Sequence, residues 1–470
     1  MTSKATRIKN ISLSQPEGRT RQAIPIHRAS EISQRLAIWL ILIALCTPTI
    51  PLFFAGVKLT PLRIAIICLL FPALSVLAQA NRRIIVSDLF AVATAVWMIG
   101  ATFVADGFQT SAFIEALEFV GAYFIGRAYV FGRPALQTFV GALEILIIVM
   151  VALALLDNAS GRNIVYETIS TVLPTTGAPN ELRMGMVRAT ATFDGSHWLG
   201  TFCACAAAIF FYSERSPIRR AMYVGLSVLG CILAFSSSPL MAAVIVASAY
   251  FYDRALAQVA WRWKLFISLL AAFYLALSMI SNDPVASIVG HLTFDPSNGW
   301  FRLNTWAHAW VNIGMSPWFG YGFKIYGDPD DFWDQASVDC VYLVFALRFG
   351  LPAVALLVVT NIASFSQLGS SFKSRTTDRY MDHLGTGSTL MLVVFLFVGV
   401  TIHFWNAPWC MWAFFIGIRA SLKEYYLKSR GTGAGQETEV APSGRAWVSR
   451  TGLRGSPRGD SASPSVRLIP

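Results

Sequence analysis

A series of apolar runs, each about 17 to 22 residues long, constrains this fold more than any other feature. A helix of about 20 apolar residues spans the hydrocarbon core of a bilayer, and only helices and closed barrels satisfy their own backbone hydrogen bonds there. Charged residues make up 13% of the chain, against about 25% in soluble globular proteins. We therefore predict an all-α polytopic membrane protein with about twelve transmembrane helices.

The predicted spans form one membrane domain over residues 36–422. They lie at about 36–56, 62–79, 86–105, 111–131, 135–156, 197–213, 221–236, 239–252, 264–281, 340–366, 386–404 and 408–422. A polar, basic tail at 1–35 precedes them, and no small-residue cleavage site follows the first apolar run, which predicts that this run stays as the first span. The tail at 423–470 is rich in Gly, Ser, Arg and Pro towards its end and is predicted to be disordered.

The distribution of basic residues predicts the orientation of these spans. All but eight of the 37 Lys and Arg residues fall on the side that carries both termini. The exceptions are Lys58, Arg63, Arg162, Arg183, Arg188, Arg302, Lys324 and Arg348. By the positive-inside rule, both termini are cytoplasmic. Basic residues at that face meet anionic lipid, which accounts for the net charge of +11 without a nucleic acid partner.

Two connections are long, at about 157–196 and about 282–339, and both are predicted to lie on the outer side. Long loops in compact proteins are usually functional or disordered, and the aromatic residues in these two favour structure. Within the second loop, the pattern at 299–313 predicts a helix on the outer interface. Its predicted apolar face carries Leu303, Trp306, Trp310 and Ile313, and its opposite, polar face carries Asn304, His308 and Asn312.

Three arginines in the outer loops are candidates for binding phosphate. Arg183 and Arg188 lie in the first loop, and Arg302 lies near the start of the helix predicted in the second. A guanidinium group matches phosphate oxygens two at a time and stays charged at any relevant pH. Basic residues are scarce on the outer side, so those retained there need a reason. The alternative is ordinary pairing with Glu181 or Asp194, or with lipid headgroups.

Asp339 is the candidate general base, because it stands immediately before an apolar run that would partly desolvate it. Desolvation raises the pKa of a carboxyl group and makes it a better base. The alternative is a helix N-cap, a common role for Asp. Asp328 and Asp330 form a D-x-D pattern, but Trp333 stands where a calcium-binding loop needs Gly, so we predict a solvated acidic loop and no metal site.

Acidic residues within predicted spans are functional candidates by default. Glu115 and Glu118 are one turn apart near the outer end of the fourth span, and Glu144 lies in the fifth. Arg348, about two turns into the tenth segment, is a possible partner for Glu115 or Glu118, or a further headgroup ligand. His308 on the polar helix face is a candidate ligand contact, with a simple hydrogen-bonding histidine as the alternative.

Three short motifs resemble a known family. R-x-x-x-W occurs as Arg302 to Trp306 and is followed by P-x-x-G-x-G at 317–322. The later segment reads SVDCVYLVFALRFGLPA, a polar pair followed by Y-L and a Gly, and RATATF contains Arg188 just before the sixth span. With these motifs, twelve spans and a dominant late outer loop, the chain resembles the O-antigen ligase and O-antigen polymerase superfamily, including exopolysaccharide polymerases.

The resemblance implies an inverting glycosyltransferase of the GT-C type at the periplasmic face of a bacterial inner membrane. The donor would be an undecaprenyl-diphosphate-linked oligosaccharide. By position, Arg188 and Arg302 would hold the diphosphate and stabilise its leaving charge, and Asp339 would deprotonate the acceptor. This scheme requires no metal and no other cofactor. Further substrate contacts are expected from Arg183, Trp306, His308, Lys324 and Arg348.

One departure from the family pattern bears on the reaction type. Family ligases carry a His-Asn pair before the Y-L element, whereas this chain has Asp339-Cys340. We therefore favour a polymerase that joins repeat units, beside a flippase and a chain-length regulator, over a ligase that transfers the glycan to lipid A core. A transporter for lipid-linked sugars is an alternative of another class, and it would rely on the charges within the spans, Glu115, Glu118, Glu144 and Arg348.

Overall fold

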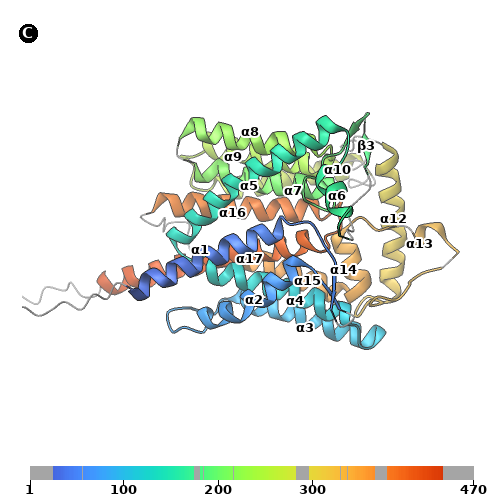
Figure 1. Ribbon diagram of the computed structural model, residues 1–470, viewed down its shortest axis with the longest axis horizontal. Helices are drawn as coiled ribbons and strands as arrows, with labels where there is room; N and C mark the ends of the chain where they lie inside the picture. Colours follow the sequence, from blue (N-terminus) through green and yellow to red (C-terminus); the bar gives the residue numbers. More distant parts are fainter. Residues whose placement is uncertain are drawn as a thin grey trace, which may run out of the picture.

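The computed structural model describes residues 25–54, 57–173, 180–183, 185–214, 216–281, 296–328, 330–335, 337–365 and 378–437. Over these residues the protein is a bundle of long helices that run side by side, with two short hairpins and a crosswise helix at one end (Figure 1). Helix α1 begins and helix α17 ends at the opposite end of the bundle (Figure 1).

The first half of the chain supplies α1 Pro25–Leu45, α2 Pro61–Leu77, α3 Val86–Asp106, α4 Thr110–Tyr129, α5 Arg133–Ser160, α6 Ile164–Ser170, α7 Ser196–Ser213 and α8 Pro217–Leu233. The second half supplies α9 Ser237–Ala255, α10 Arg262–Ile280, α12 Pro296–Met315, α13 Phe332–Gln335, α14 Val341–Phe349, α15 Leu351–Phe365, α16 Arg379–Val398 and α17 Ala407–Glu437. Strand β1 (Leu52–Phe54) pairs antiparallel with β2 (Val57–Leu59), and β3 (Leu182–Arg183) pairs antiparallel with β4 (Met186–Val187).

Every predicted span overlaps a helix, and four helices in the described part of the chain, α3, α5, α10 and α16, are long and apolar enough to cross a membrane. Helices α2 and α15 are apolar but shorter. This is the composition of a helical membrane protein. Several boundaries differ from the prediction. Helix α1 begins at Pro25 and α17 continues to Glu437, so parts of both predicted tails are helical. The first predicted span, 36–56, is wrong beyond Leu45, where α1 ends and strand β1 follows, and the span predicted at 386–404 ends at Val398.

The predicted tenth span at 340–366 is not one helix but two. Gly350, with φ of +80°, separates α14 from α15. A Cβ atom at this position would lie 1.9 Å from the carbonyl oxygen of Trp318. Glycine is therefore required both for the left-handed backbone and for the close approach of another segment, and the helix breaks where that segment crosses it.

The core of the bundle forms where small residues let helices approach closely. Every residue of α7 except His197 is buried, and α7 contacts α5, α8, α9 and α16. Helices α4 and α17 touch at two glycines, because a Cβ atom at Gly126 would lie 2.3 Å from the carbonyl oxygen of Phe414, and one at Gly417 would lie 2.1 Å from that of Tyr123. Such close contacts replace the hydrophobic effect as the source of helix association in lipid.

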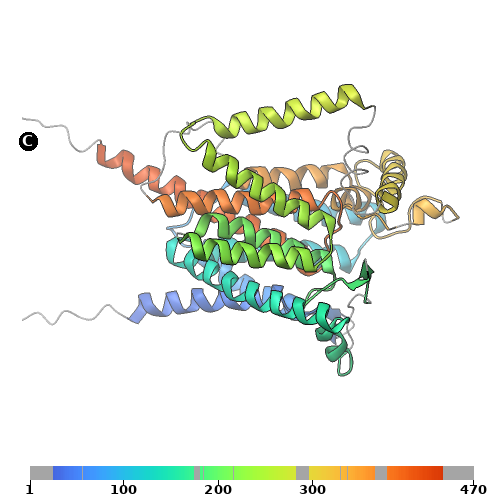
Figure 2. The ribbon, with the colours of Figure 1, turned by 90° about the horizontal axis from the view of Figure 1, so that it is seen from above.

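Helix α10 differs from the others, because none of its residues is buried (Figure 2). It stands apart from the bundle, joined at its start by an ion pair of 2.5 Å between Arg262 Nε and Asp253 Oδ1. Its mean hydropathy is 1.8 over 18 residues, and its exposed residues are mostly apolar. A helix that is apolar all round is suited to a lipid environment.

The helix predicted at 299–313 exists as α12 and lies across the end of the bundle (Figure 1). Its buried face includes Ala309, Asn312 and Ile313, which pack against α14. Trp310 is 57% exposed. The expected division into faces is therefore wrong for Asn312, which is 2% exposed beside Ile313, because the small Ala309 brings this side of α12 against α14.

The first long loop is tied to the bundle by two carboxylates. Asp157, at the end of α5, accepts backbone N–H bonds from Ile164, Thr190 and Ala191 at 2.8 to 3.2 Å. Asp194 accepts the Thr49 hydroxyl at 2.5 Å, and also the hydroxyl of Tyr166. These bonds give the loop a defined path over the same end of the bundle as α12.

Candidate active site at the α12 end of the bundle

Arg302 lies in the second turn of α12, and charges from both long loops act on it. Burial lowers the pKa of its guanidinium group, the charge of Arg183 lowers it further, and the charge of Asp339 opposes both. Arg302 forms no hydrogen bond or ion pair with any residue that the structure describes. A half-buried guanidinium group in this state has all five donors available for an anion.

Asp339 precedes α14 by two residues and sits within reach of that charge. Burial raises the pKa of its carboxyl group above the ordinary value, whereas Arg302 and a bond of 3.4 Å from the Ser337 hydroxyl oppose the shift. The N-cap position of α14 belongs to Cys340, so the alternative role of Asp339 as the helix cap is wrong. The carboxylate of Asp339 therefore lies near Arg302 and does not cap α14.

The β3–β4 hairpin brings the other two arginines to the same place. Arg183 donates from Nη1 to the carbonyl oxygen of Phe235, in the turn between α8 and α9, at 2.9 Å. Arg188 forms an ion pair with Glu181, as the alternative reading expected. Burial lowers the pKa of Arg188, with Arg183 and Arg302 adding to the shift and Glu181 opposing it. The Nε atom of Arg188 is buried and has no partner in the described part of the chain.

The predicted arginines and Asp339 therefore form one electrostatic cluster, although they come from segments more than a hundred residues apart. His197, the second residue of α7, joins it, because the charges of both Arg188 and Arg302 act on its ring. Sequence reasoning assigned no role to His197. Its position directly before an apolar run, like that of Asp339, was the available signal.

Two of the expected substrate contacts, Trp306 and His308, lie on α12 and pack against neighbouring elements. Trp306 packs on a small apolar cluster between α12 and α14 that includes Val338 and Leu343. His308 faces α13, with its Nδ1 atom 3.9 Å from Asp331 Oδ2 and its ring 6.2 Å from that of Trp333. The structure does not bring either ring into contact with the arginine cluster within its described residues.

Lys324 is held at the end of α3. Its Nζ atom donates to the carbonyl oxygen of Ala105 at 2.8 Å and lies 3.6 Å from Asp106 Oδ1. The side chain fastens the loop after α12 to α3 and is not among the charges that act on Arg302.

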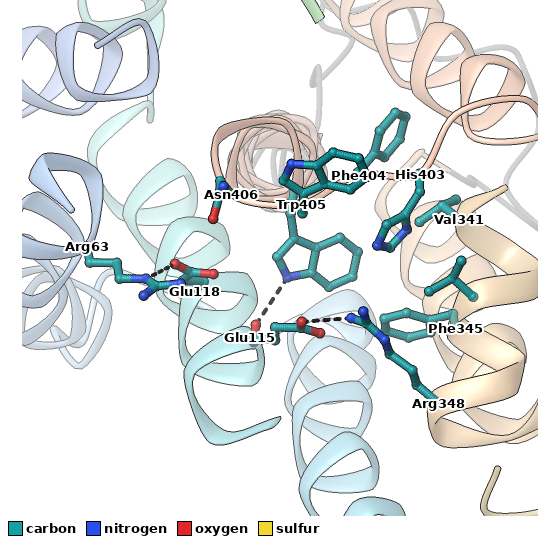
Figure 3. A pocket seen from close by; sticks show the side chains of 12 residues that line it. Arg63, Glu115, Glu118, Val341, Phe345, Arg348, His403, Phe404, Trp405 and Asn406 are labelled. Atoms are coloured by element: carbon teal, nitrogen blue, oxygen red, sulfur yellow. Dashed lines mark hydrogen bonds and ion pairs between the residues drawn. The ribbon is translucent and has the colours of Figure 1, made fainter. Parts of the chain in front are cut away.

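The acidic residues within the predicted spans are all paired with arginines. Arg348 Nη1 donates to Glu115 Oε1 at 2.9 Å, which confirms the expected partnership. Arg63 Nε donates to Glu118 Oε1 at 2.5 Å (Figure 3). Glu144 accepts from Arg219 at 2.9 Å. Arg63 and Arg219 were not anticipated as partners.

The D-x-D pattern forms a local turn, in which the backbone N–H of Asp330 donates to Asp328 Oδ1 at 2.9 Å. Among the described residues, no three His, Cys, Asp or Glu side chains gather closely enough to hold a metal ion.

One family model matches the part of the chain that carries this site. Residues 184–358 match the family model described as O-antigen ligase. No curated protein matches the chain. The matched segment runs from the β3–β4 hairpin into α15, so it contains Arg188, Arg302 and Asp339. The match over residues 184–358 supports a relationship to the O-antigen ligase and polymerase superfamily.

Proposed function

We propose that this protein is an inverting glycosyltransferase that polymerises undecaprenyl-diphosphate-linked repeat units into a surface polysaccharide. The observation that carries the proposal is the cluster in which the charge of Arg302 acts on Asp339 and on the neighbouring Arg188, with Arg183 beside both arginines. Members of the O-antigen ligase family act on lipid-linked glycans in membranes. Such a donor combines a diphosphate, which arginines bind, with a sugar carbon that a hydroxyl group attacks.

Arg302 is the first contact for the diphosphate in this proposal, because it has no partner among the described residues. Arg188 keeps Glu181 as a partner and adds charge from the neighbouring hairpin. Both guanidinium groups stabilise the negative charge that builds on the diphosphate as it leaves. Preorganised cations can perform this role where other transferases use a metal ion.

Asp339 accepts the proton of the acceptor hydroxyl in the same step. The hydroxyl oxygen bonds to the anomeric carbon of the donor, the bond from that carbon to the phosphate oxygen breaks, and the lipid diphosphate leaves as an anion. A single displacement of this kind inverts the anomeric centre. The raised pKa of the Asp339 carboxyl group favours this role, because a base works best when its pKa lies close to the operating pH.

The Asp339-Cys340 pair, in place of the His-Asn pair of family ligases, is the reason to prefer polymerisation over transfer to lipid A core. The transporter alternative needs unpaired charges within the spans. Glu115, Glu118 and Glu144 are each paired with an arginine, so they do not favour it.

The same proposal includes the architecture and location. The chain crosses a bacterial inner membrane twelve times as a GT-C-type transferase, with its catalytic membrane domain over 36–422 and periplasmic loops at about 157–196 and 282–339. Basic tails at 1–35 and 423–470 keep both termini cytoplasmic. A flippase and a chain-length regulator are the proposed partners.

The test uses the purified protein in liposomes with the lipid-linked oligosaccharide of its own host, and resolves the products by size. We expect a ladder of lengthening lipid-linked glycans. Arg302→Ala should lower the rate at least about 100-fold, because one lost oxyanion donor has an effect of that order. Arg162→Ala is the matched control, since it removes another outer arginine, 63% exposed, that lies outside the cluster.

Failure of the wild-type protein to lengthen the donor would contradict polymerisation. Transfer of a single glycan to a core lipid would instead support a ligase. Full activity of Arg302→Ala would remove this residue from the mechanism.

A further inference from the structure

A polar pocket lies at the same end of the bundle as the arginine cluster, between α4, α14 and the connection from α16 to α17 (Figure 3). Its walls carry Arg63, Glu115, Glu118, Arg348, His403 and Trp405. The enclosed part measures about 50 Å³. None of these side chains takes part in the arginine cluster around Asp339, so the proposed reaction leaves the pocket without a role.

The charges of the pocket cancel. Glu118 accepts from Arg63 at 2.5 Å, and Glu115 accepts from Arg348 at 2.9 Å. An anion would therefore gain little here, in contrast to the site at Arg302, which has no ion-pair partner among the described residues. The pocket is suited to a ligand that is polar but carries no net charge.

Several hydrogen-bonding groups of the pocket are unused. One oxygen of each carboxylate, Glu115 and Glu118, accepts no bond from the described residues. The Nδ1 atom of His403 is buried and has no partner in the part of the chain that the structure describes. The side-chain amide of Asn406 lines the pocket as well. Acceptors and donors mixed in this way match the hydroxyl groups of a sugar, each of which both donates and accepts.

Aromatic surface accompanies these polar groups. Trp405 is 44% exposed at the rim of the pocket. Trp409 is held in the wall, where its Nε1 atom donates to the carbonyl oxygen of Glu115 at 3.1 Å and its ring stacks 4.9 Å from that of Phe119. A flat apolar ring beside hydrogen-bonding groups suits a sugar ring, which has apolar C–H faces and a polar edge.

The pocket runs along α14 away from Asp339. Val341, the first lining residue on this helix, follows Asp339 by two positions, and Arg348 marks the far end. At 1.5 Å per residue these two lining residues are about 10 Å apart. A chain of two linked sugar rings covers such a distance, so a glycan bound here would end beside the candidate base.

We propose that this pocket is the binding site for the acceptor glycan, and that it presents the attacking hydroxyl to Asp339. The ligand is an uncharged oligosaccharide end, with one ring edge in the enclosed part and a neighbouring ring against Trp405. This inference rests on the proposed function. It separates the two substrates, because the arginine cluster binds the diphosphate and the paired charges bind the sugars.

The test measures binding of a glycan that has neither lipid nor diphosphate. The probe is the reducing oligosaccharide released by mild acid from the host's lipid-linked repeat unit, titrated calorimetrically into the full-length protein in nanodiscs. Trp405→Ala and Glu118→Gln should each raise the Kd about tenfold. Glu118→Gln keeps the size and one acceptor for Arg63, so it is the variant that best preserves folding.

Two controls separate the pocket from the arginine cluster. Trp261→Ala, at an exposed tryptophan outside the pocket, should bind the oligosaccharide as the wild type does. Arg302→Ala should also bind it normally while losing polymerisation. In the liposome assay, the pocket variants should need more acceptor for half-maximal elongation and reach the wild-type rate at saturation.

The outcomes distinguish the two proposals. A normal ladder with pocket variants that bind and elongate like the wild type would overturn the acceptor site and leave the polymerase standing. Binding of the oligosaccharide that depends on Trp405, without any ladder, would overturn the polymerase and leave a glycan site. No binding of the oligosaccharide by the wild type would overturn the acceptor site.

Discussion

The charge of Arg302 acts on Asp339 across two separate segments, and it sets which protonation state the carboxyl group takes. Burial favours the neutral acid, and the guanidinium group favours the carboxylate. A general base must be ionised, so the arginine that we assign to the diphosphate also favours the ionised form of Asp339. The two candidate residues are therefore expected to depend on one another.

The pH profile of the reaction should report this dependence. The rate should rise with pH as Asp339 loses its proton, with a midpoint above the ordinary carboxyl pKa of 3.8 because burial raises the pKa. Arg302→Gln should move this midpoint to higher pH, since a positive charge that lowers the pKa is removed. Arg302→Lys should restore it. The measurement is kcat/KM against pH in liposomes, and identical midpoints for all three proteins would contradict the coupling.

Replacing the base itself should have a larger effect. Asp339→Asn keeps the shape of the side chain but cannot accept a proton, so the rate should fall about 10²- to 10⁴-fold. Asp330→Asn is the matched control, because Asp330 is an exposed acid in the same outer loop. The measurement is the rate of glycan elongation by Asp339→Asn and by Asp330→Asn. Equal rates would show that Asp339 is not the base.

At the scale of elements, the segment Pro317–Gly322 determines how α12 meets α14. The backbone N–H of Tyr321 donates to Leu347 O at 2.7 Å, and that of Gly322 donates to Arg348 O at 3.0 Å. In return, Leu351 N–H donates to Pro317 O at 2.8 Å. These bonds satisfy the carbonyl groups that the end of α14 leaves open. Through these bonds, the glycine-rich motif fixes the position of α12 relative to α14. It thereby fixes the position of Arg302, on α12, relative to Asp339, which precedes α14.

Gly350→Ala should disturb this junction. The new Cβ atom would lie 1.9 Å from Trp318 O, and the φ of +80° is strained for alanine, with a cost of about 1–3 kcal/mol before the clash is counted. We expect a lower melting temperature in detergent and slower elongation. Gly100→Ala is the control, because a Cβ atom there meets nothing within 4 Å and the residue lies inside α3. Wild-type behaviour of Gly350→Ala would exclude a role for the junction.

At the scale of the whole molecule, a buried network of charges joins the helices at the end opposite α12, where α3 begins and α17 continues outward (Figure 1). Arg127 pairs with Glu424 at 2.5 Å and with Asp88 at 3.1 Å, and Arg82 pairs with the same Glu424 at 3.0 Å. The side chains of Arg127 and Glu424 are 0% exposed. Helices α3, α4 and α17 are therefore linked by charges that cannot separate without burying an unpaired ion.

Glu424→Ala should be strongly destabilising, because removing one partner from a buried ion pair costs about 3–5 kcal/mol. Thermal unfolding of the purified protein and its yield in membranes are the measurements. Glu167→Ala removes a 42% exposed acid from a surface pair and should cost at most about 1 kcal/mol. A Glu424→Ala protein as stable as Glu167→Ala would show that the network contributes no net stability.

The proposed orientation can be tested with reporter fusions. A fluorescent protein fused after residue 437 should fluoresce, because that end is proposed to be cytoplasmic, where such reporters fold. Alkaline phosphatase inserted between Asp330 and Asp331, in the acidic outer loop, should be active, since the enzyme needs the oxidising side of the membrane. The reverse pattern would invert the topology and place the arginine cluster on the cytoplasmic side.

Helix positions were largely determined by the sequence, because they depend on local properties. Run length and the need to satisfy backbone hydrogen bonds predict where α3, α5 and α16 lie, and the periodicity of 299–313 predicts α12. The sequence also singled out Arg302 and Asp339, since charges are conspicuous in outer loops and next to apolar runs.

Only the tertiary structure decided which of these groups meet. The break at Gly350 follows from Trp318 crossing the helix, and the pairing of Arg63 with Glu118 joins residues that no sequence period relates. The bond from Lys324 to the end of α3 likewise joins segments that lie far apart in the chain. Contacts between distant segments depend on how the helices pack together, and a residue's own neighbours in the chain do not encode that arrangement.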